Sequence, residues 1–203
     1  MKQKSSPQSQ KKIAILATDG FEKSELFEPK RALEASGFAV DVISLKSGKI
    51  KSWDKKDWGK SINVDVLLKK ASAEDYCALV LPGGVMNPDA LRIEKAAIKF
   101  VRAFMQSNKP IAAICHGPWT LIEADCVQGK RMTSWPSLKT DLKNAGAEWV
   151  DEKVVIDGNL ITSRKPEDIP AFNKKLIQMI RIGHQARLTK KLLDDKVTSF
   201  VQH

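Results

Sequence analysis

The segment KPIAAICHGPW, residues 109–119, gives the clearest indication of the fold of this chain. Its apolar run, Ile111 to Ile114, has the length and composition of a strand that is buried on both faces of a sheet. The next four residues, Cys115-His116-Gly117-Pro118, end the strand, and proline is well tolerated in the first turn of a helix. The sequence therefore predicts a strand, a sharp turn and a helix. In open α/β sheets, ligands and nucleophiles gather at this kind of strand end.

The sequence on either side repeats this alternation of short apolar runs with longer segments of helical period. Such alternation predicts an α/β fold with a mostly parallel central sheet that helices cover on both faces. The strands that we expect are residues 13–17, 39–45, 78–81 and 111–114, with an extra strand or hairpin arm within 62–68 and a β arm over 154–163. The helices that we expect are residues 24–36, a helix capped by Asn87 or Asp89 that runs to 106, a short helix ending near 146 and a helix from about 167.

Length and composition indicate one packed domain with short extensions. The chain has 203 residues, of which 42% are hydrophobic and 29% charged, as in ordinary globular domains. We expect a basic flexible tail over 1–11, an α/β domain over 12–182 and an amphipathic helical extension over 183–203. No window approaches the roughly 18 apolar residues of a membrane span, and the first twelve residues lack the apolar core of a secretory signal. We therefore expect a cytoplasmic protein without a membrane partner.

The net charge of +10 raises the question of an acidic partner. Six lysines and two tryptophans fall in LKSGKIKSWDKKDWGK, residues 45–60, which we expect to be a solvated loop. Because no recognised nucleic-acid-binding motif accompanies this charge, we do not expect a specific nucleic-acid partner.

The cysteine and histidine pattern points away from metal chemistry. The three cysteines, Cys77, Cys115 and Cys126, have no CxxC spacing, so neither a disulfide framework nor a zinc ribbon is indicated. Gly59-Lys60-Ser61 ends like a phosphate-binding loop, but Asp54 stands where that loop needs its first glycine. We expect no metal and no cofactor, and we interpret Cys77 and Cys126 as packing residues.

Cys115 is the candidate nucleophile. It follows an apolar strand and precedes a helix, whose unpaired N–H groups and dipole favour thiolate over thiol. The alternative is a small buried core residue, as lone cysteines often are. Adjacent His116 should offer its backbone N–H as an oxyanion donor, because its ring cannot easily point into the same pocket, and Gly83 and Gly84 allow a second donor to approach closely.

A carboxyl group is expected near the sulfur. Glu22 lies just beyond the first strand, at the same sheet edge as Cys115 if the two strands are parallel. Because two nearby anions repel, one proton would be shared, and Glu22 would hold it and donate to the sulfur. The alternative is that Glu22 only begins a helix. Trp119 and Trp135 are candidate pocket walls, and Arg164 faces either a carboxylate product or an ordinary ion-pair partner.

Five segments in order, ATDGFEKSEL, LVLPGG, ICHGPW, TSWPSLKTDLKNAGAEWVD and ITSRKPEDIPAF, resemble the PfpI/ThiJ superfamily, in particular its PfpI-like intracellular protease and deglycase branch. The resemblance implies a flavodoxin-like three-layer sandwich with Cys115 as nucleophile, Glu22 as its carboxyl partner, and Gly84 and His116 as oxyanion donors. It also implies a homo-oligomer, a dimer or hexamer, in which an acid from a second subunit orients the histidine. Asp89 is the nearest candidate for that acid, displaced by about one position from the glutamate of some relatives.

These residues predict a cofactor-independent cysteine hydrolase. The leading hypothesis is a glyoxalase III or deglycase that acts on small carbonyl substrates or glycated protein side chains, with lactate or glycolate as product. The same nucleophile could cleave an amide, so a peptidase or amidase is the alternative within enzymes. A redox-responsive stress protein or chaperone, in which Cys115 is oxidised, is the hypothesis from another class, and a noncatalytic member of the fold is a further alternative.

Overall fold

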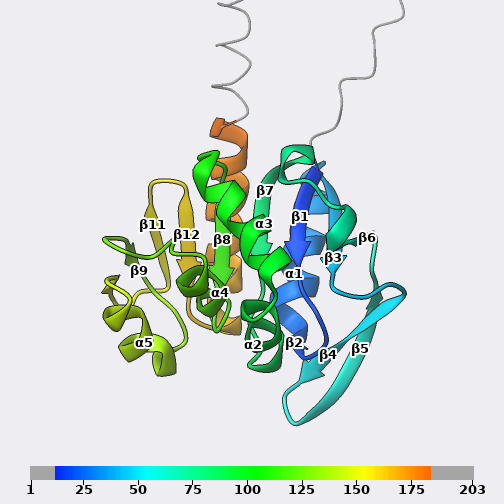
Figure 1. The fold of residues 1–203 in the computed structure, drawn as a ribbon, viewed down its shortest axis with the longest axis horizontal. Helices are drawn as coiled ribbons and strands as arrows, with labels where there is room; N and C mark the ends of the chain where they lie inside the picture. The colour runs from blue at the N-terminus through cyan, green and yellow to red at the C-terminus, as the bar shows by residue number, and fades with distance from the viewer. Residues whose placement is uncertain (1–11, 184–203) are drawn as a thin grey trace, which may run out of the picture.

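The computed structural model describes residues 12–183, and the predicted tail over 1–11 and most of the predicted extension over 183–203 lie outside them. A seven-stranded sheet runs through the domain in the order β11-β12-β8-β7-β1-β3-β6 (Figure 1). Its strands are parallel except for β11, which pairs antiparallel with β12. They are β1 (Lys12–Leu16), β3 (Ala39–Ser44), β6 (Val66–Leu67), β7 (Tyr76–Leu81), β8 (Ile111–Ile114), β11 (Val154–Asp157) and β12 (Leu160–Ser163).

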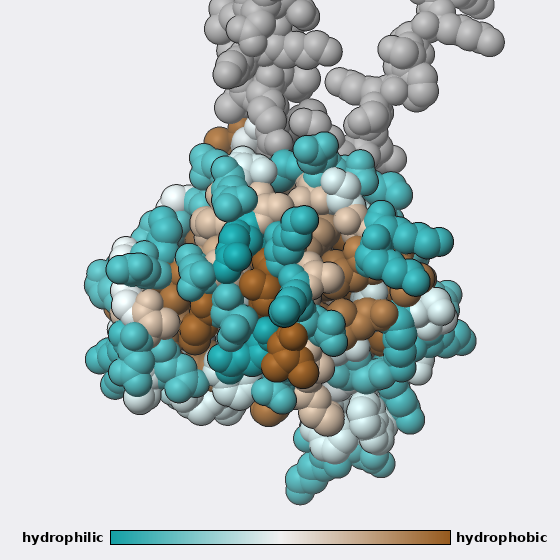
Figure 2. All heavy atoms as spheres, in the orientation of Figure 1, coloured by the Kyte–Doolittle hydropathy of each residue, from teal (hydrophilic) through white to brown (hydrophobic). Residues whose placement is uncertain are grey.

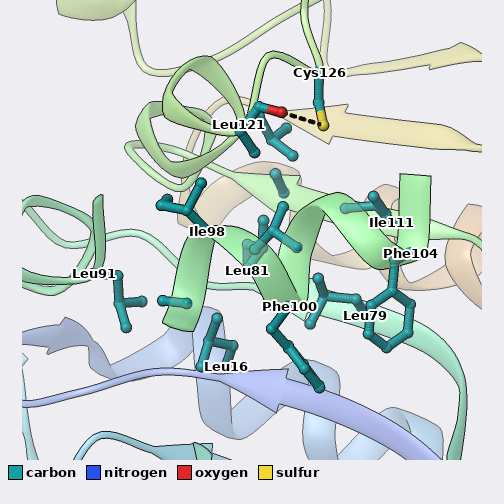
Figure 3. Packing of buried hydrophobic residues seen from close by; sticks show 14 of the residues in the cluster. Leu16, Leu79, Leu81, Leu91, Ile98, Phe100, Phe104, Ile111, Leu121 and Cys126 are labelled. Carbon is teal, nitrogen blue, oxygen red and sulfur yellow. Dashed lines mark hydrogen bonds between the residues drawn. The ribbon is translucent and has the colours of Figure 1, made fainter. Parts of the chain in front are cut away.

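Helices pack on both faces of this sheet and make three layers. On one face, α3 (Lys95–Gln106) and α4 (Pro118–Glu123) cover alternate residues of the strands, and Figure 3 shows Phe100 and Phe104 of α3 against Leu79 and Ile111. The outer side of this layer carries mainly hydrophilic side chains with smaller hydrophobic areas between them (Figure 2). On the other face, α1 (Lys23–Ala35) and the helix over 169–183 enclose the second core cluster.

The remaining elements connect these layers. They are β2 (Phe21–Glu22), β4 (Lys49–Asp54), β5 (Asp57–Asn63), α2 (Met86–Arg92), β9 (Arg131–Met132), α5 (Lys139–Asn144), β10 (Glu148–Trp149) and the 3-10 turns η1 (Leu68–Lys70), η2 (Ala73–Asp75), η3 (Pro136–Leu138) and η4 (Pro166–Asp168). None of the helices within residues 12–183 is long and apolar enough to cross a membrane. Cys77 and Cys126 are buried in the two core clusters, as expected of packing residues.

Two sequence predictions are wrong. The basic stretch over 45–60 is not a loop but most of an antiparallel hairpin, β4 and β5, which extends β2 into a separate three-stranded sheet. The helix expected from Asn87 or Asp89 to residue 106 is two helices, α2 and α3, and neither side chain caps it. The buried Asn87 amide instead accepts from the Thr18 N–H and donates to the carbonyls of Pro82 and Gly83, which ties α2 to two strand ends.

Candidate functional site

Cys115 occupies a strained turn between β8 and α4. Its φ of 61° lies in the left-handed region, which costs a non-glycine residue about 1–2 kcal/mol. The surrounding chain holds it there: its N–H donates to the Ser163 carbonyl at 3.0 Å, and its carbonyl accepts from the Trp135 N–H at 2.9 Å. Gly117 is required two residues later, because a Cβ there would lie 2.4 Å from the carbonyl oxygen of Leu81. The turn therefore presents the cysteine side chain in one fixed direction.

The Cys115 thiol is buried, with 6% of the residue exposed. Burial raises the pKa of this thiol, and Glu25 raises it further in its ionised form, whereas the backbone N–H groups of His116 and Gly84 lower it. The helix end therefore favours the thiolate, as expected, but burial opposes it. The two N–H groups favour the anion, but removal of water from the sulfur outweighs them.

The carboxyl group that faces the sulfur belongs to Glu25, not to Glu22. Glu25 is fully buried in the first turn of α1, where one carboxyl oxygen, Oε2, accepts the Gly83 N–H at 2.8 Å. Burial, with the charge of Glu22 as a second cause, raises the pKa of Glu25 to about 8, and Cys115 lies within hydrogen-bonding reach. The other oxygen, Oε1, is buried without a hydrogen-bond partner among the described residues, a costly state for an anion. Glu25 is therefore a protonated carboxylic acid at neutral pH.

Glu22 begins a helix, which was the alternative to a role as the carboxyl partner of Cys115. Its side chain caps α1, accepting from the Glu25 N–H at 2.9 Å and the Ser24 hydroxyl at 2.5 Å. The cap carboxylate thus fixes the start of the helix that carries Glu25. The first turn of α1 separates the two carboxyl groups. Glu25 lies on the buried face of the helix, with Pro29 and Leu33, whereas Glu22 is half-buried at the helix end.

The ring of His116, and not only its N–H, contacts Cys115. Nδ1 lies 3.2 Å from the Cys115 sulfur, and Nε2 lies 3.3 Å from the hydroxyl of Ser137. The ring stacks on Trp135 and meets the edge of Trp119, which leaves 8% of the residue exposed. Burial lowers the pKa of His116, so the imidazole is neutral and can accept a proton. The expectation that this ring points elsewhere is wrong, because the left-handed turn at Cys115 brings neighbouring side chains together.

Gly83 and Gly84 pack tightly against this site. A Cβ at Gly83 would lie 2.6 Å from Glu25 Oε2 and 2.7 Å from the Cβ of Cys115. At Gly84, where φ is 76°, a Cβ would lie 2.3 Å from the Gly20 carbonyl oxygen. The absence of side chains lets the backbone reach both Glu25 and the sulfur, so the N–H groups of Gly84 and His116 both lie at the Cys115 sulfur.

The other predicted site residues lie further out. Trp135, 39% exposed, covers one face of the His116 ring. Asp89 is exposed on α2, and its contact with a second subunit stays a prediction. Arg164 takes the ion-pair alternative: it pairs with Asp168 at 2.8 Å and Asp151 at 2.6 Å.

The fold and this site together define a class: α/β proteins with a cysteine at a strained strand-to-helix turn, beside a buried acid. A profile described as the DJ-1/PfpI family matches residues 11–179, and the chain belongs to this family. Its sheet and helical layers are the flavodoxin-like fold of these proteins.

Named relatives are similar over the whole domain. "Putative cysteine protease YraA" of Bacillus subtilis is 40% identical and "Deglycase TK1284" of Thermococcus kodakarensis is 38% identical; each match covers 84% of this chain and 99% of the relative. A solved Anabaena variabilis protein with DJ-1/ThiJ/PfpI-like and ferritin-like domains superposes with a TM-score of 0.80 and 38% identity, over 85% of this chain and 48% of that two-domain chain.

Sequence analysis missed Glu25 and Ser137. A signal for Glu25 exists, since Glu25, Pro29 and Leu33 recur every four residues on the buried face of α1. Ser137 offers no comparable pattern, because its contact with His116 depends on how the η3 turn lies against the strand end.

Proposed function

We propose that this protein is a cofactor-independent cysteine enzyme that acts on reactive carbonyls, such as methylglyoxal or its early adducts with protein side chains. The observation that supports this most is the buried, protonated carboxyl group of Glu25 beside the Cys115 thiol. Such an acid can protonate a carbonyl oxygen and, once ionised, can remove a proton from carbon. The deglycase relative supports the substrate class. Cytoplasmic location, a role in stress defence and a homo-oligomer are parts of the same proposal.

The first step forms a hemithioacetal. His116 Nδ1, 3.2 Å from the sulfur, takes the thiol proton as the sulfur bonds to the aldehyde carbon. Glu25 gives its proton to the aldehyde oxygen, which becomes a hydroxyl group. The N–H groups of Gly84 and His116 stabilise negative charge that develops on this oxygen. The products of the step are a neutral adduct, an imidazolium and a carboxylate.

The second step is an isomerisation that needs no oxidant. The Glu25 carboxylate moves the hydrogen of the sulfur-bonded carbon, as a proton, to the neighbouring carbonyl carbon. His116 gives a proton to the oxygen of that second carbon and takes a proton from the hydroxyl group of the sulfur-bonded carbon. The product is the thioester of a 2-hydroxy acid. Water then hydrolyses the thioester to lactate from methylglyoxal, or glycolate from glyoxal, and the proton on His116 returns to Glu25.

A peptidase or amidase is the second candidate function. The contact between Cys115 and His116 favours it, because a cysteine with a base within hydrogen-bond reach can also attack an amide. The relative named as a cysteine protease supports the same alternative.

The test compares four proteins: wild type, Cys115→Ala, Glu25→Gln and Glu22→Gln. Lactate formation from methylglyoxal and cleavage of a fluorogenic peptide are measured for each. We expect carbonyl turnover in wild type, none in Cys115→Ala, and a loss on the order of 100-fold or more in Glu25→Gln, the usual contribution of a general acid-base. Glu22→Gln is the matched control, because glutamine can still cap α1, and it should stay near the wild-type rate.

Two results would contradict this proposal. Equal carbonyl turnover in wild type and Cys115→Ala removes the nucleophile, and a Glu25→Gln enzyme as fast as Glu22→Gln removes the acid. Peptide cleavage without carbonyl turnover in wild type selects the second candidate function.

A further inference from the structure

Both nitrogens of the His116 ring contact polar groups of the same chain, and these contacts set the orientation of the ring. Nδ1 faces the Cys115 sulfur at 3.2 Å, and Nε2 faces the Ser137 hydroxyl at 3.3 Å on the opposite side of the ring. Trp135 stacks against the imidazole at 6.1 Å between centroids, and Trp119 meets it edge-on at 5.2 Å. The aromatic contacts limit tilting of the ring, but a ring rotated by half a turn would fit between them equally well. The polar contacts of Nδ1 with the sulfur and of Nε2 with the Ser137 hydroxyl distinguish the two orientations.

The backbone fixes the turn that carries Ser137, which is an exposed residue. Ser137 lies in the 3-10 turn Pro136–Leu138, and the Leu138 N–H closes that turn on the Trp135 carbonyl at 3.1 Å. Leu138 is fully buried and anchors one end of the turn. At the other end, the Trp135 N–H donates to the carbonyl of Cys115 itself at 2.9 Å. The turn that carries the hydroxyl is therefore tied directly to the residue whose thiol the histidine contacts.

The charged groups near the ring are occupied elsewhere. Asp141 accepts from the Trp119 indole N–H at 2.9 Å, and Arg92 lies over the other side of that indole. Within residues 12–183, the hydrogen bonds of the His116 ring are those to Cys115 and Ser137. The partner at Nε2 is thus a neutral hydroxyl, which adds no negative charge to favour imidazolium at rest.

We propose that Ser137 is a positioning residue: its hydroxyl accepts the Nε2–H of His116 and so keeps the Nδ1 lone pair directed at the Cys115 thiol, within a single chain. The effect of Ser137 on turnover rests on the proposed function, in which Nδ1 takes the thiol proton. The same hydrogen bond persists after that transfer, because Nε2 keeps its proton in the imidazolium. The ring therefore does not have to turn during the reaction.

The experiment compares Ser137→Ala with Ser137→Thr, which keeps the hydroxyl. Thr140→Ala is the matched control, since it removes an exposed hydroxyl three residues further along the same segment. The 15N signals of the imidazole report which ring nitrogen carries the proton. The chain has three histidines, so a His116→Gln spectrum assigns the signals. Steady-state kinetics with methylglyoxal are measured on the same full-length proteins.

We expect Ser137→Ala to shift the His116 signals toward a mixture of tautomers. It should lower kcat about tenfold, the size expected when one neutral hydrogen bond is lost, with little change in KM. Ser137→Thr should restore both the signals and kcat, and Thr140→Ala should change neither.

The proposal is overturned if Ser137→Ala keeps the wild-type 15N signals, or if Asp89→Asn shifts those signals while Ser137→Ala does not. The second result would mean that an acid from another copy holds the ring. Failure of the proposed function is distinguishable. A wild type without carbonyl turnover, whose His116 signals still move in Ser137→Ala and return in Ser137→Thr, rejects the reaction and supports the positioning role.

Discussion

Glu22, whose carboxyl group caps α1, and Glu25, whose carboxyl group faces the Cys115 thiol, are three positions apart in the sequence. Glu22 was the predicted partner because it lies just beyond the first strand, at the same sheet edge as Cys115. One helical turn carries the chain from the end of the sheet inward, so Glu25 and not Glu22 lies on the buried face with Pro29 and Leu33. The type of residue beside the sulfur was predictable from the chemistry, but its position depended on the phase of the helix.

The buried acid makes the stability of the protein depend on pH. The pKa of Glu25 is raised from 4.5 to about 8 in the folded state, so between these values the folded protein keeps a proton that the unfolded chain has lost. The free energy of unfolding should therefore fall as pH rises through this window, by at most about 1.4 kcal/mol for each pH unit.

Glu25→Gln should remove this dependence, because glutamine is neutral at all pH values and can still accept the Gly83 N–H. Urea unfolding at pH 5 and pH 8 measures the effect. The difference in free energy of unfolding between variant and wild type at pH 5 serves as the reference. From pH 5 to pH 8 this difference should change by roughly 2–4 kcal/mol in favour of the variant. Glu22→Gln, measured in parallel, removes only the second cause of the raised Glu25 pKa and leaves its burial intact, so it should keep most of the wild-type dependence. Parallel pH curves for wild type and Glu25→Gln would show that Glu25 ionises normally.

Among the elements, the buried strands were the most predictable and the hairpin the least. The runs that form β1, β7 and β8 are almost wholly apolar, as strands covered on both faces must be. In β4, lysines at alternate positions face solvent while Ile50 and Ser52 between them are buried. This alternation is a strand signal, but the density of positive charge concealed it. The break between α2 and α3 has no glycine or proline, so nothing local in the sequence marks it.

The loop after β7 should be the element most sensitive to an added methyl group. Gly84 and Gly48 both have φ near 80°, at 76° and 84°, so alanine is strained at either position by about 1–2 kcal/mol. At Gly48 a Cβ would meet nothing within 4 Å, whereas at Gly84 it would lie 2.3 Å from the Gly20 carbonyl oxygen and 2.8 Å from the Glu22 nitrogen.

Gly84→Ala should therefore cost roughly 1–3 kcal/mol more than strain alone and displace the N–H that points at the sulfur. Thermal unfolding and the rate of Cys115 alkylation by iodoacetamide measure the two effects. Gly48→Ala should show only the cost of strain and a wild-type alkylation rate. If the two variants behave alike, close packing at Gly84 does not shape the site.

In the whole molecule, the fold class and the position of Cys115 at a strand end were predictable, but the relation of the site to other subunits was not. Both follow from one rule, that parallel strands bring their carboxyl ends to one edge of the sheet. The resting state of the sulfur could not be predicted in the same way, because it depends on how completely three segments exclude water from Cys115. Sequence patterns show which residues are apolar, but not how closely they enclose a polar atom.

The contacts of the site predict that one chain holds a complete set of catalytic groups. Co-expressing Cys115→Ala with Asp89→Asn tests this in any oligomer the protein forms. Asp89→Asn should retain most of its activity alone, and the mixture should show only the activity of its Asp89→Asn subunits. Activity that rises above this level would mean that an intact Asp89 of one copy rescues the cysteine of another.

The central claim is that Glu25 is a protonated acid beside the Cys115 thiol at neutral pH, and infrared difference spectroscopy tests it most directly. The spectrum of wild type minus Glu25→Gln should contain the carbonyl stretch of a protonated carboxylic acid at pH 7, and this band should disappear as the pH rises through about 8. A difference spectrum at pH 7 that contains only carboxylate bands would contradict the account.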